Sequence, residues 1–257
     1  MGPSRVGSAG AMTPPETHGR RAVLGLLGAG TTGAAVLLAT GGTASAAVAE
    51  IPTETAGPYP ADGSNGPDVL LQDGVVRSDI RRSFGSSTTR AKGEPFRFTL
   101  VLVDTATGQP LEGLAVYAWH ANRDGKYSLY SEGITGENYL RGVQVSTARG
   151  KVRFRSIYPA CYDGRWPHIH FEVYADLATA RASGTPLVTS QVALPRRQSV
   201  QVYRRAGGYD SSITNLDRVS LSSDMVFGDD GGVHQLATMR GGVEKGYRAK
   251  LVVPVDV

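Results

Sequence analysis

Short apolar segments recur along the chain from Phe96 to the C-terminus. They alternate with polar residues or run continuously, are enriched in β-branched and aromatic residues, and span 96–104, 114–121, 151–158, 168–175, 187–195 and 247–257. Turn-forming stretches such as TGQPLEG, TARGK and SGTP separate them. Because no strong helical period lies between the segments, we predict an all-β fold, an antiparallel β-sandwich core with long irregular loops. Weak indications of short helices occur only in RRAGGYDSS and DLATARAS.

The N-terminal 46 residues have the pattern of a targeting segment. Arg20 and Arg21 precede a Gly/Ala-rich apolar stretch, and small residues at 44–46 form a candidate cleavage site. This pattern is typical of a Tat-type signal peptide and predicts a secreted protein with no stable membrane association after cleavage. A membrane-spanning anchor is the alternative, although Gly and Thr interrupt the apolar stretch.

The remaining chain is predicted to form a single domain over residues 47–257. Residues 47–95 are rich in Pro, Gly and Thr and indicate an extended N-terminal arm with pocket-lining loops, and residues 96–257 indicate the β-sandwich core. The net charge of +4 owes part of its value to the leader, so it supports no nucleic-acid partner. Cys161 is the single cysteine of the sequence, which excludes an intramolecular disulfide.

Two of the five histidines, His168 and His170, lie one residue apart on a predicted strand. Residues i and i+2 of a strand project from the same face, so both imidazoles can reach one metal ion while Ile169 points into the core. A pair of strand histidines without a metal is the alternative. Two tyrosines favour the metal: Tyr127 follows a strand and a Gly-containing turn, and Tyr162 ends a Pro-containing loop.

Two phenols beside two imidazoles favour a particular kind of metal. The phenol of free tyrosine titrates only near pH ~10, so it becomes an effective ligand at neutral pH when a strongly Lewis-acidic cation lowers that pKa. Ferric iron meets this need better than Zn²⁺, whereas Ca²⁺ and Mg²⁺ prefer carboxylates. The residue types therefore favour a non-haem Fe(III) site.

Three motifs, in this order, resemble the intradiol ring-cleavage dioxygenases. LEGLAVYAWHANRDGKY is similar to the family's Trp-[Gln/His]-Ala-[Asn/Asp]-x-x-Gly-x-Tyr, FRSIYPACY to its [Thr/Ser]-Ile-x-Pro-x-x-Tyr, and RWPHIHF to its Arg-x-x-His-x-His. The resemblance covers roughly residues 51–195. It implies a β-sandwich with an Fe(III) ion held between sheet ends by four ligands: Tyr127, Tyr162, His168 and His170.

The resemblance also implies an activity and a pocket. Such enzymes open catechol-type aromatic diols with O₂ to cis,cis-muconate-type products. Arg165 and Gln191 match residues beside the substrate and join Tyr162 as candidate catalytic residues, while Pro58 and Tyr59 match a pocket-lining segment. The expected partners are a small diol and O₂, with a possible homo-oligomer.

Several alternatives remain at this point. Arg165 could form a structural salt bridge, and Gln191 could be an ordinary strand residue. A zinc hydrolase could use the histidine pair with Glu172, which shares their face. The main alternative function is a non-catalytic exported β-sandwich binding module with a vestigial metal site. His120 is interpreted as a packing residue. The export signal and the missing N-terminal helical linker indicate a secreted actinobacterial-type subgroup, and the sequence does not select one catechol.

Overall fold

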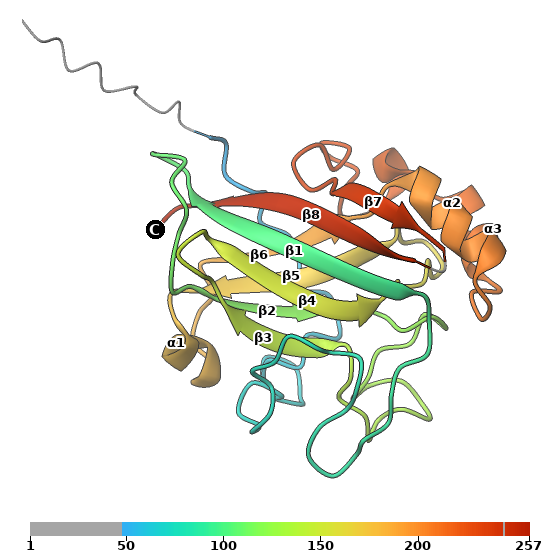
Figure 1. The fold of residues 1–257 in the computed structure, drawn as a ribbon, viewed down its shortest axis with the longest axis horizontal. Coiled ribbons are helices and arrows are strands. Elements are labelled where there is room, and N and C mark those ends of the chain that lie inside the picture. Colours follow the sequence, from blue (N-terminus) through green and yellow to red (C-terminus); the bar gives the residue numbers. More distant parts are fainter. Residues whose placement is uncertain (1–47, 244) are drawn as a thin grey trace, which may run out of the picture. The chain divides into compact units, whose positions relative to one another are not determined.

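The computed structural model describes residues 48–243 and 245–257, and the predicted leader lies outside them. Two four-stranded sheets dominate (Figure 1). The first sheet has the order β4-β1-β8-β7 and consists of β4 (Lys151–Ile157), β1 (Pro95–Asp104), β8 (Gly246–Val255) and β7 (Thr238–Gly242). The second sheet has the order β3-β2-β5-β6 and consists of β3 (Arg141–Val145), β2 (Ala115–Trp119), β5 (His168–Tyr174) and β6 (Val188–Ala193). The predicted β-rich class is confirmed.

The prediction of a purely antiparallel fold is wrong for one strand pair. β1 and β8 pair in parallel, with Phe96 opposite Tyr247 and Leu100 opposite Leu251, and the other pairs are antiparallel. A parallel pair cannot be joined by a hairpin and needs a long crossover connection. Here the connection contains the whole second sheet and the helices, because β1 is the first strand of the chain and β8 the last.

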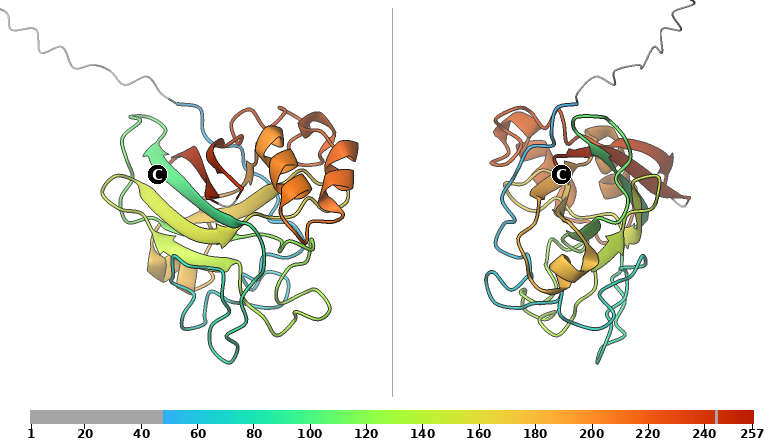
Figure 2. Two further views of the ribbon diagram at one scale, coloured as in Figure 1. Left: turned by 45° about the vertical axis from the view of Figure 1, so that its right-hand side comes forward. Right: turned by 90° about the vertical axis from the view of Figure 1, so that its left-hand side faces the viewer.

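Three short α-helices and one 3₁₀ turn accompany the sheets: α1 (Leu177–Arg181), α2 (Arg196–Arg205), α3 (Ser212–Arg218) and η1 (Leu221–Ser223). The side chain of Asp176 caps α1 by accepting from the Thr179 amide at 2.6 Å. The sequence did not indicate α2, in which only Ser199, Val202 and Tyr203 are buried among arginines and glutamines. Figure 2 shows α2 and α3 side by side, next to β7.

The largest core cluster lies between the two sheets. Alternate residues of the strands enter it, including Phe96, Phe98 and Leu100 from β1 and Ile169 and Phe171 from β5. This arrangement confirms that Ile169 points into the core. Burial of these side chains is the main favourable contribution to folding.

A second core cluster covers the opposite face of the second sheet. Tyr117 and Trp119 from β2 and Tyr174 from β5 belong to it, together with loop residues such as Val69 and Tyr127. The second sheet is therefore buried on both faces, which explains why every residue of β5 is buried. This is also the face on which His168 and His170 lie.

The N-terminal segment, defined here as residues 48–62, runs along both sheets. The Ile51 amide donates to the Pro254 carbonyl at 3.1 Å, and the Glu54 amide donates to the Thr189 carbonyl at 2.8 Å. The hydroxyl of Ser190 donates to the Pro52 carbonyl at 2.7 Å. These bonds bring residues 55–62 over the histidine face. Within the part of the chain that the structure describes, no helix has the length and apolar character to cross a bilayer.

Candidate metal centre and active site

The two histidines are held at the centre of the second sheet. In the strand register, His170 lies opposite Trp119 of β2 on one side and Gln191 of β6 on the other. The Trp119 and His170 rings stack with their centroids 4.9 Å apart and their planes 7° from parallel. His168 and His170 are 2% and 3% exposed, respectively. β-Strand alternation thus places both imidazoles beneath the loops on one face.

This position differs from the expectation that the metal lies between the sheet ends. His168 and His170 alternate with Ile169, which lies in the core between the sheets, so both histidines project from the other face of the second sheet. The N-terminal segment and the loops that carry Tyr127 and Tyr162 cover them. The correction follows from the alternation of side chains along one strand.

A tight turn before Tyr127 brings the first tyrosine to this face. The Asn122 side-chain oxygen accepts hydrogen bonds from the amides of Asp124 and Lys126, both at 2.9 Å. Gly125 has φ +79°, and a Cβ there would lie 3.1 Å from the Cβ of Tyr162. Glycine is therefore required both for the turn and for the close approach of the second tyrosine.

Four side-chain atoms converge at the candidate centre. The oxygen of Tyr127 lies 3.4 Å from that of Tyr162, 3.3 Å from Nε2 of His168 and 3.2 Å from Nε2 of His170. Nε2 of His168 lies 3.2 Å from the oxygen of Tyr162 and 3.1 Å from Nε2 of His170. Two ligands about 2.1 Å from one metal ion and about 90–110° apart lie about 3.0–3.4 Å from each other. The four side chains therefore fit ligands of a single cation.

Burial sets the protonation of these groups. Burial, followed by the charge of Arg165, lowers the pKa of His168 to about 3, and burial lowers the pKa of His170. Burial raises the pKa of the Tyr127 and Tyr162 phenols. At neutral pH the imidazoles are consequently neutral and have lone pairs to donate. The phenols keep their protons until a strongly charged cation displaces them.

The orientation of each imidazole has its own cause. Nδ1 of His168 is hydrogen-bonded to the Trp166 carbonyl, which assigns the proton to Nδ1 and leaves a lone pair on Nε2. Nδ1 of His170 is buried without a hydrogen-bond partner among the described residues, so stacking on Trp119 positions this ring. Gly57 of the N-terminal segment, at φ +71°, allows the backbone to approach His170: a Cβ there would lie 3.3 Å from Cε1.

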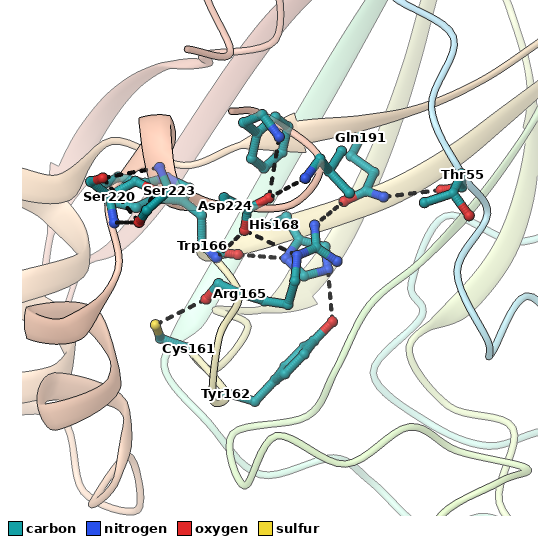
Figure 3. Close-up of polar contacts among 12 residues, drawn as sticks. Thr55, Cys161, Tyr162, Arg165, Trp166, His168, Gln191, Ser220, Ser223 and Asp224 are labelled. Atoms are coloured by element: carbon teal, nitrogen blue, oxygen red, sulfur yellow. Dashed lines mark hydrogen bonds and ion pairs between the residues drawn. The ribbon is translucent and has the colours of Figure 1, made fainter. Parts of the chain in front are cut away.

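Arg165 is fixed between two partners beside the centre (Figure 3). Its Nε donates to the Asp224 carboxylate at 3.0 Å, and its Nη2 donates to the side-chain oxygen of Gln191 at 2.7 Å. Gln191 in turn donates to the Thr55 carbonyl at 3.0 Å. The structure thus brings the predicted residues Arg165 and Gln191 together. Arg165 also forms the salt bridge that was the alternative interpretation of this residue.

Asp224 was not among the site residues predicted from the sequence. Its carboxylate also accepts from the amides of Trp166 at 2.6 Å and Val226 at 2.8 Å, and the residue is 2% exposed. Burial acts to raise the pKa of Asp224, but the hydrogen bond from Trp166 and the charge of Arg165 outweigh it and lower the pKa. No motif marks Asp224, because it lies far from the histidine pair in the sequence and reaches the site only through the fold.

The predicted pocket residues Pro58 and Tyr59 lie in the N-terminal segment. The Tyr59 ring is tilted against Tyr127, with centroids 5.0 Å apart, and is 37% exposed. Pro58 is exposed, and its carbonyl accepts from the Asn65 side chain at 2.7 Å. Tyr59 therefore lies beside the candidate centre, where it can separate Tyr127 from water.

The other described histidines and Cys161 have different surroundings. His120 is buried, and its ring nitrogens contact the Ala121 carbonyl at 2.8 Å and the Ser156 hydroxyl at 2.6 Å, away from the four converging atoms. The thiol of Cys161 donates to the Arg165 carbonyl at 3.3 Å, and burial raises its pKa to about 12. His234 is exposed. These contacts fit the interpretation of His120 as a packing residue.

The zinc alternative depended on Glu172. Its carboxylate accepts from the Tyr174 hydroxyl at 2.6 Å, and burial raises its pKa to about 7. No group of three His, Cys, Asp or Glu side chains that could hold a metal ion occurs within residues 48–243 and 245–257. The candidate ligand set of the described chain is therefore the two phenols and two imidazoles.

Known proteins match this chain in both sequence and fold. Residues 74–183 match the family model described as Dioxygenase. Chlorocatechol 1,2-dioxygenase of Rhodococcus opacus is 37% identical over 71 residues, which are 28% of this chain and 27% of the relative. Catechol 1,2-dioxygenase 1 of Acinetobacter lwoffii is 30% identical over 138 residues, with 42% of this chain and 44% of the relative covered. Over part of its length the chain is therefore similar to the dioxygenases of this family model and to catechol and chlorocatechol 1,2-dioxygenases.

A solved structure has a similar fold. The intradiol ring-cleavage dioxygenase from Tetranychus urticae superposes with a TM-score of 0.63 at 22% identity, over 81% of this chain and 95% of that one. At this identity the likeness concerns the fold. The chain spans less than half the length of either curated relative, so its substrate and activity are inferred from its own site.

Proposed function

We propose that this chain is an intradiol dioxygenase that opens catechol-type diols with O₂ to cis,cis-muconate-type products at a non-haem Fe(III) site. The convergence of the four ligand atoms of Tyr127, Tyr162, His168 and His170, at separations of 3.1–3.4 Å, carries the proposal. The similarity of residues 74–183 to the family model described as Dioxygenase supports it. A non-catalytic binding module would not need two buried phenols directed at two neutral imidazoles.

The donor set suits ferric iron. Neutral imidazole nitrogens and phenol oxygens are the ligands that the two histidines and two tyrosines offer, and no carboxylate joins the four converging atoms. When bound, Fe(III) supplies the positive charge that makes the phenols and the hydroxyls of a bound diol acidic. His168 and His170 hold it through Nε2, and Tyr127 and Tyr162 hold it through their hydroxyl oxygens.

The remaining roles belong to the chain's own side chains. Tyr162 is the most exposed of the four candidate ligands, so its oxygen is placed to accept a proton from an incoming diol. The charge of Arg165 lowers the pKa of Tyr162 against the effect of burial, and the same charge stabilises negative charge on the diol. Gln191, fixed by Arg165 and Thr55, orients the substrate, and Tyr59 limits access of water.

Oxygen consumption with a panel of diols tests the activity. The panel contains catechol, protocatechuate, hydroxyquinol and a lignin-derived catechol, and ring-opened products are identified by mass spectrometry. We expect Tyr162→Phe and His168→Ala to abolish oxygen uptake, and Arg165→Ala to lower kcat about a hundredfold while iron is retained.

Matched variants serve as controls. Tyr158→Phe alters a buried phenol that contacts Ser199 at 2.8 Å, and His120→Gln alters a buried imidazole outside the four ligands. Both should keep wild-type turnover. If Tyr162→Phe and Tyr158→Phe were equally active, the assignment of the site would be wrong.

We also propose the broader organisation expected from the sequence. Residues 1–46 act as a Tat-type signal peptide, residues 47–95 form an arm with pocket-lining loops, and the two sheets form a β-sandwich within residues 96–257. The double variant Arg20→Lys/Arg21→Lys tests the export route. We expect the unprocessed protein to accumulate inside the cell, and unchanged secretion would contradict the assignment.

A further inference from the structure

The outer face of the first sheet is strongly basic. Along its strands, residues that alternate with the core residues point outward, and six exposed cations define what we call the basic face: Arg97, Arg153, Arg155, Arg240, Arg248 and Lys250. None of the outward positions of these four described strands carries Asp or Glu. In Figure 1 this sheet faces the viewer, and no helix lies in front of it.

The strand register places four arginines in one row. Arg97 of β1 lies opposite Arg155 of β4 on one side and Arg248 of β8 on the other, and Arg248 lies opposite Arg240 of β7. Neighbouring strands are about 4.8 Å apart, so the row crosses about 14 Å of sheet. Like charges directly opposite each other destabilise a sheet. The folded protein therefore carries an electrostatic repulsion that a bound anion would relieve.

Internal counter-ions offset little of this charge. Among the described residues, Arg155 alone of the six takes part in an ion pair, with Asp79 at 3.9 Å. Asp79 is already paired more closely with Arg81, at 2.6 Å. The Arg155 and Asp79 side chains are 52% and 40% exposed, so this pair is weak. The guanidinium groups of the basic face remain available to a ligand.

Two depressions accompany the arginine row. A cavity of about 170 Å³ is lined by Arg97, Arg155 and Arg248, together with Arg81 and Lys245. A second depression, of about 570 Å³, is lined by Arg153, Arg240, Arg248 and Lys250. Arg248 lines both. Two adjacent hollows with basic walls can receive successive anionic groups of one chain.

We propose that the basic face binds a linear anionic polymer with repeated phosphate groups and no bases. Five of its six cations are arginines, whose planar guanidinium binds two phosphate oxygens at once. The row and the two hollows fit a polymer better than a single anion. The outward positions of the four strands carry no aromatic side chain on which a nucleic-acid base could stack. The same positions lack the Trp and Phe that anchor proteins in a membrane interface.

This surface is separate from the candidate metal centre. The basic face lies on the outer side of the first sheet, whereas His168 and His170 project from the far side of the second. The core between the sheets separates them. Polymer binding is therefore independent of the proposed enzyme activity, and it would hold the protein on a phosphate-rich material while leaving the metal centre accessible.

The test measures binding of a fluorescently labelled linear inorganic polyphosphate to the full chain at several salt concentrations. We expect binding that weakens steeply with salt, and an affinity reduced about tenfold or more in Arg97→Gln/Arg248→Gln. The charge-matched control Arg197→Gln/Arg218→Gln alters exposed arginines of α2 and α3 and should bind within about twofold of wild type. Tyr162→Phe should bind like wild type.

Further outcomes decide the ligand class. Equal affinity of the two double variants, or no binding by wild type, would overturn the proposal. Single-stranded DNA, poly-glutamate or phosphatidylserine vesicles that bound as tightly as polyphosphate at equal charge would overturn the choice of polymer. Because the basic-face variant removes repulsion between Arg97 and Arg248, its thermal midpoint should equal or exceed that of wild type, so lost binding would not reflect unfolding.

Discussion

Arg165 depends on a buried carboxylate that lies outside the motifs. The side chains of Arg165 and Asp224 are 10% and 0% exposed, and their contact at 3.0 Å joins the loop before β5 to the turn after η1. Removing one partner of a buried ion pair leaves the other charge without compensation, which is more costly than the pair itself is stabilising. Asp224 thus positions Arg165 and also contributes to folding.

Asp224→Asn tests this role. We expect a loss of about 3 kcal/mol in the free energy of unfolding, measured by urea denaturation, because the guanidinium of Arg165 stays buried without its counter-ion. Asp217→Asn, which breaks the exposed pair with Arg196 at 2.8 Å, should cost less than about 1 kcal/mol. Equal losses in the two variants would show that the buried pair contributes no more to the free energy of unfolding than the exposed pair does.

Glu172 should make stability depend on pH. Burial raises its pKa from 4.5 to about 7, while the hydrogen bond from Tyr174 opposes the shift and Asp62 adds to it. Between these two values the unfolded chain is ionised while the folded carboxyl keeps its proton, so the contribution of Glu172 to stability falls as pH rises from about 4.5 to 7. The buried histidines, whose pKa is lowered, contribute in the opposite direction below about pH 6.5. The shift corresponds to about 3 kcal/mol.

Glu172→Gln should remove this contribution, so the stability of the variant relative to wild type should rise between about pH 5 and pH 8. Urea denaturation at about pH 5 and pH 8 measures it, with Glu112→Gln, at an exposed carboxyl, as the control. We expect Glu112→Gln to keep the pH dependence of wild type. A Glu172→Gln protein whose stability changed with pH in the same way as that of wild type would contradict the assignment.

At the scale of elements, Arg141 connects the N-terminal segment to the second sheet. This arginine, the first residue of β3, is 1% exposed. It donates to the carbonyls of Tyr59 at 2.9 Å, Pro60 at 2.8 Å and Ser128 at 2.9 Å, and to the hydroxyl of Tyr117 at 3.0 Å. The guanidinium, with five donors in a fixed plane, suits this set of acceptors.

Arg141→Lys should loosen the segment over the metal centre. A lysine keeps the charge but cannot reach all the acceptors, and the unmet buried carbonyls should cost about 3 kcal/mol. Hydrogen exchange and limited proteolysis of residues 57–62 measure the effect. Arg149→Lys, at an exposed position, is the control. Unchanged protection of residues 57–62 in Arg141→Lys would contradict this role.

The sequence predicted the strands whose inward residues alternate clearly. Phe96, Phe98 and Leu100 mark β1, and the spacing of His168 and His170 placed both imidazoles on one face. Local pattern carries no information about which strands become neighbours, so the parallel pairing of β1 with β8 could not be read from it. The contact of Arg165 with Asp224 was equally hidden, because the fold alone brings these residues together.

At the scale of the whole molecule, the proposed metal should stabilise the fold. Tyr127, Tyr162 and the histidines come from three separate parts of the chain, so a cation that binds all four resists their separation. Iron that binds only the folded state adds about 2.7 kcal/mol when its free concentration is 100 Kd. Thermal unfolding with and without a chelator measures this effect.

Chelation should lower the thermal midpoint of wild type and leave that of His168→Ala unchanged. Since two phenols must lose their protons on binding, loading with iron should also release protons. Identical melting of wild type with and without the chelator, at confirmed iron loading, would mean that the metal does not connect these segments.

The most direct test of the central claim is a titration of the purified protein with Fe(III), followed by visible absorption. We predict a burgundy phenolate-to-iron charge-transfer band that saturates at one equivalent of iron per chain, disappears in the double variant Tyr127→Phe/Tyr162→Phe and persists in Tyr158→Phe. A wild-type protein that bound one iron without such a band, or a double variant that kept the band, would contradict the account.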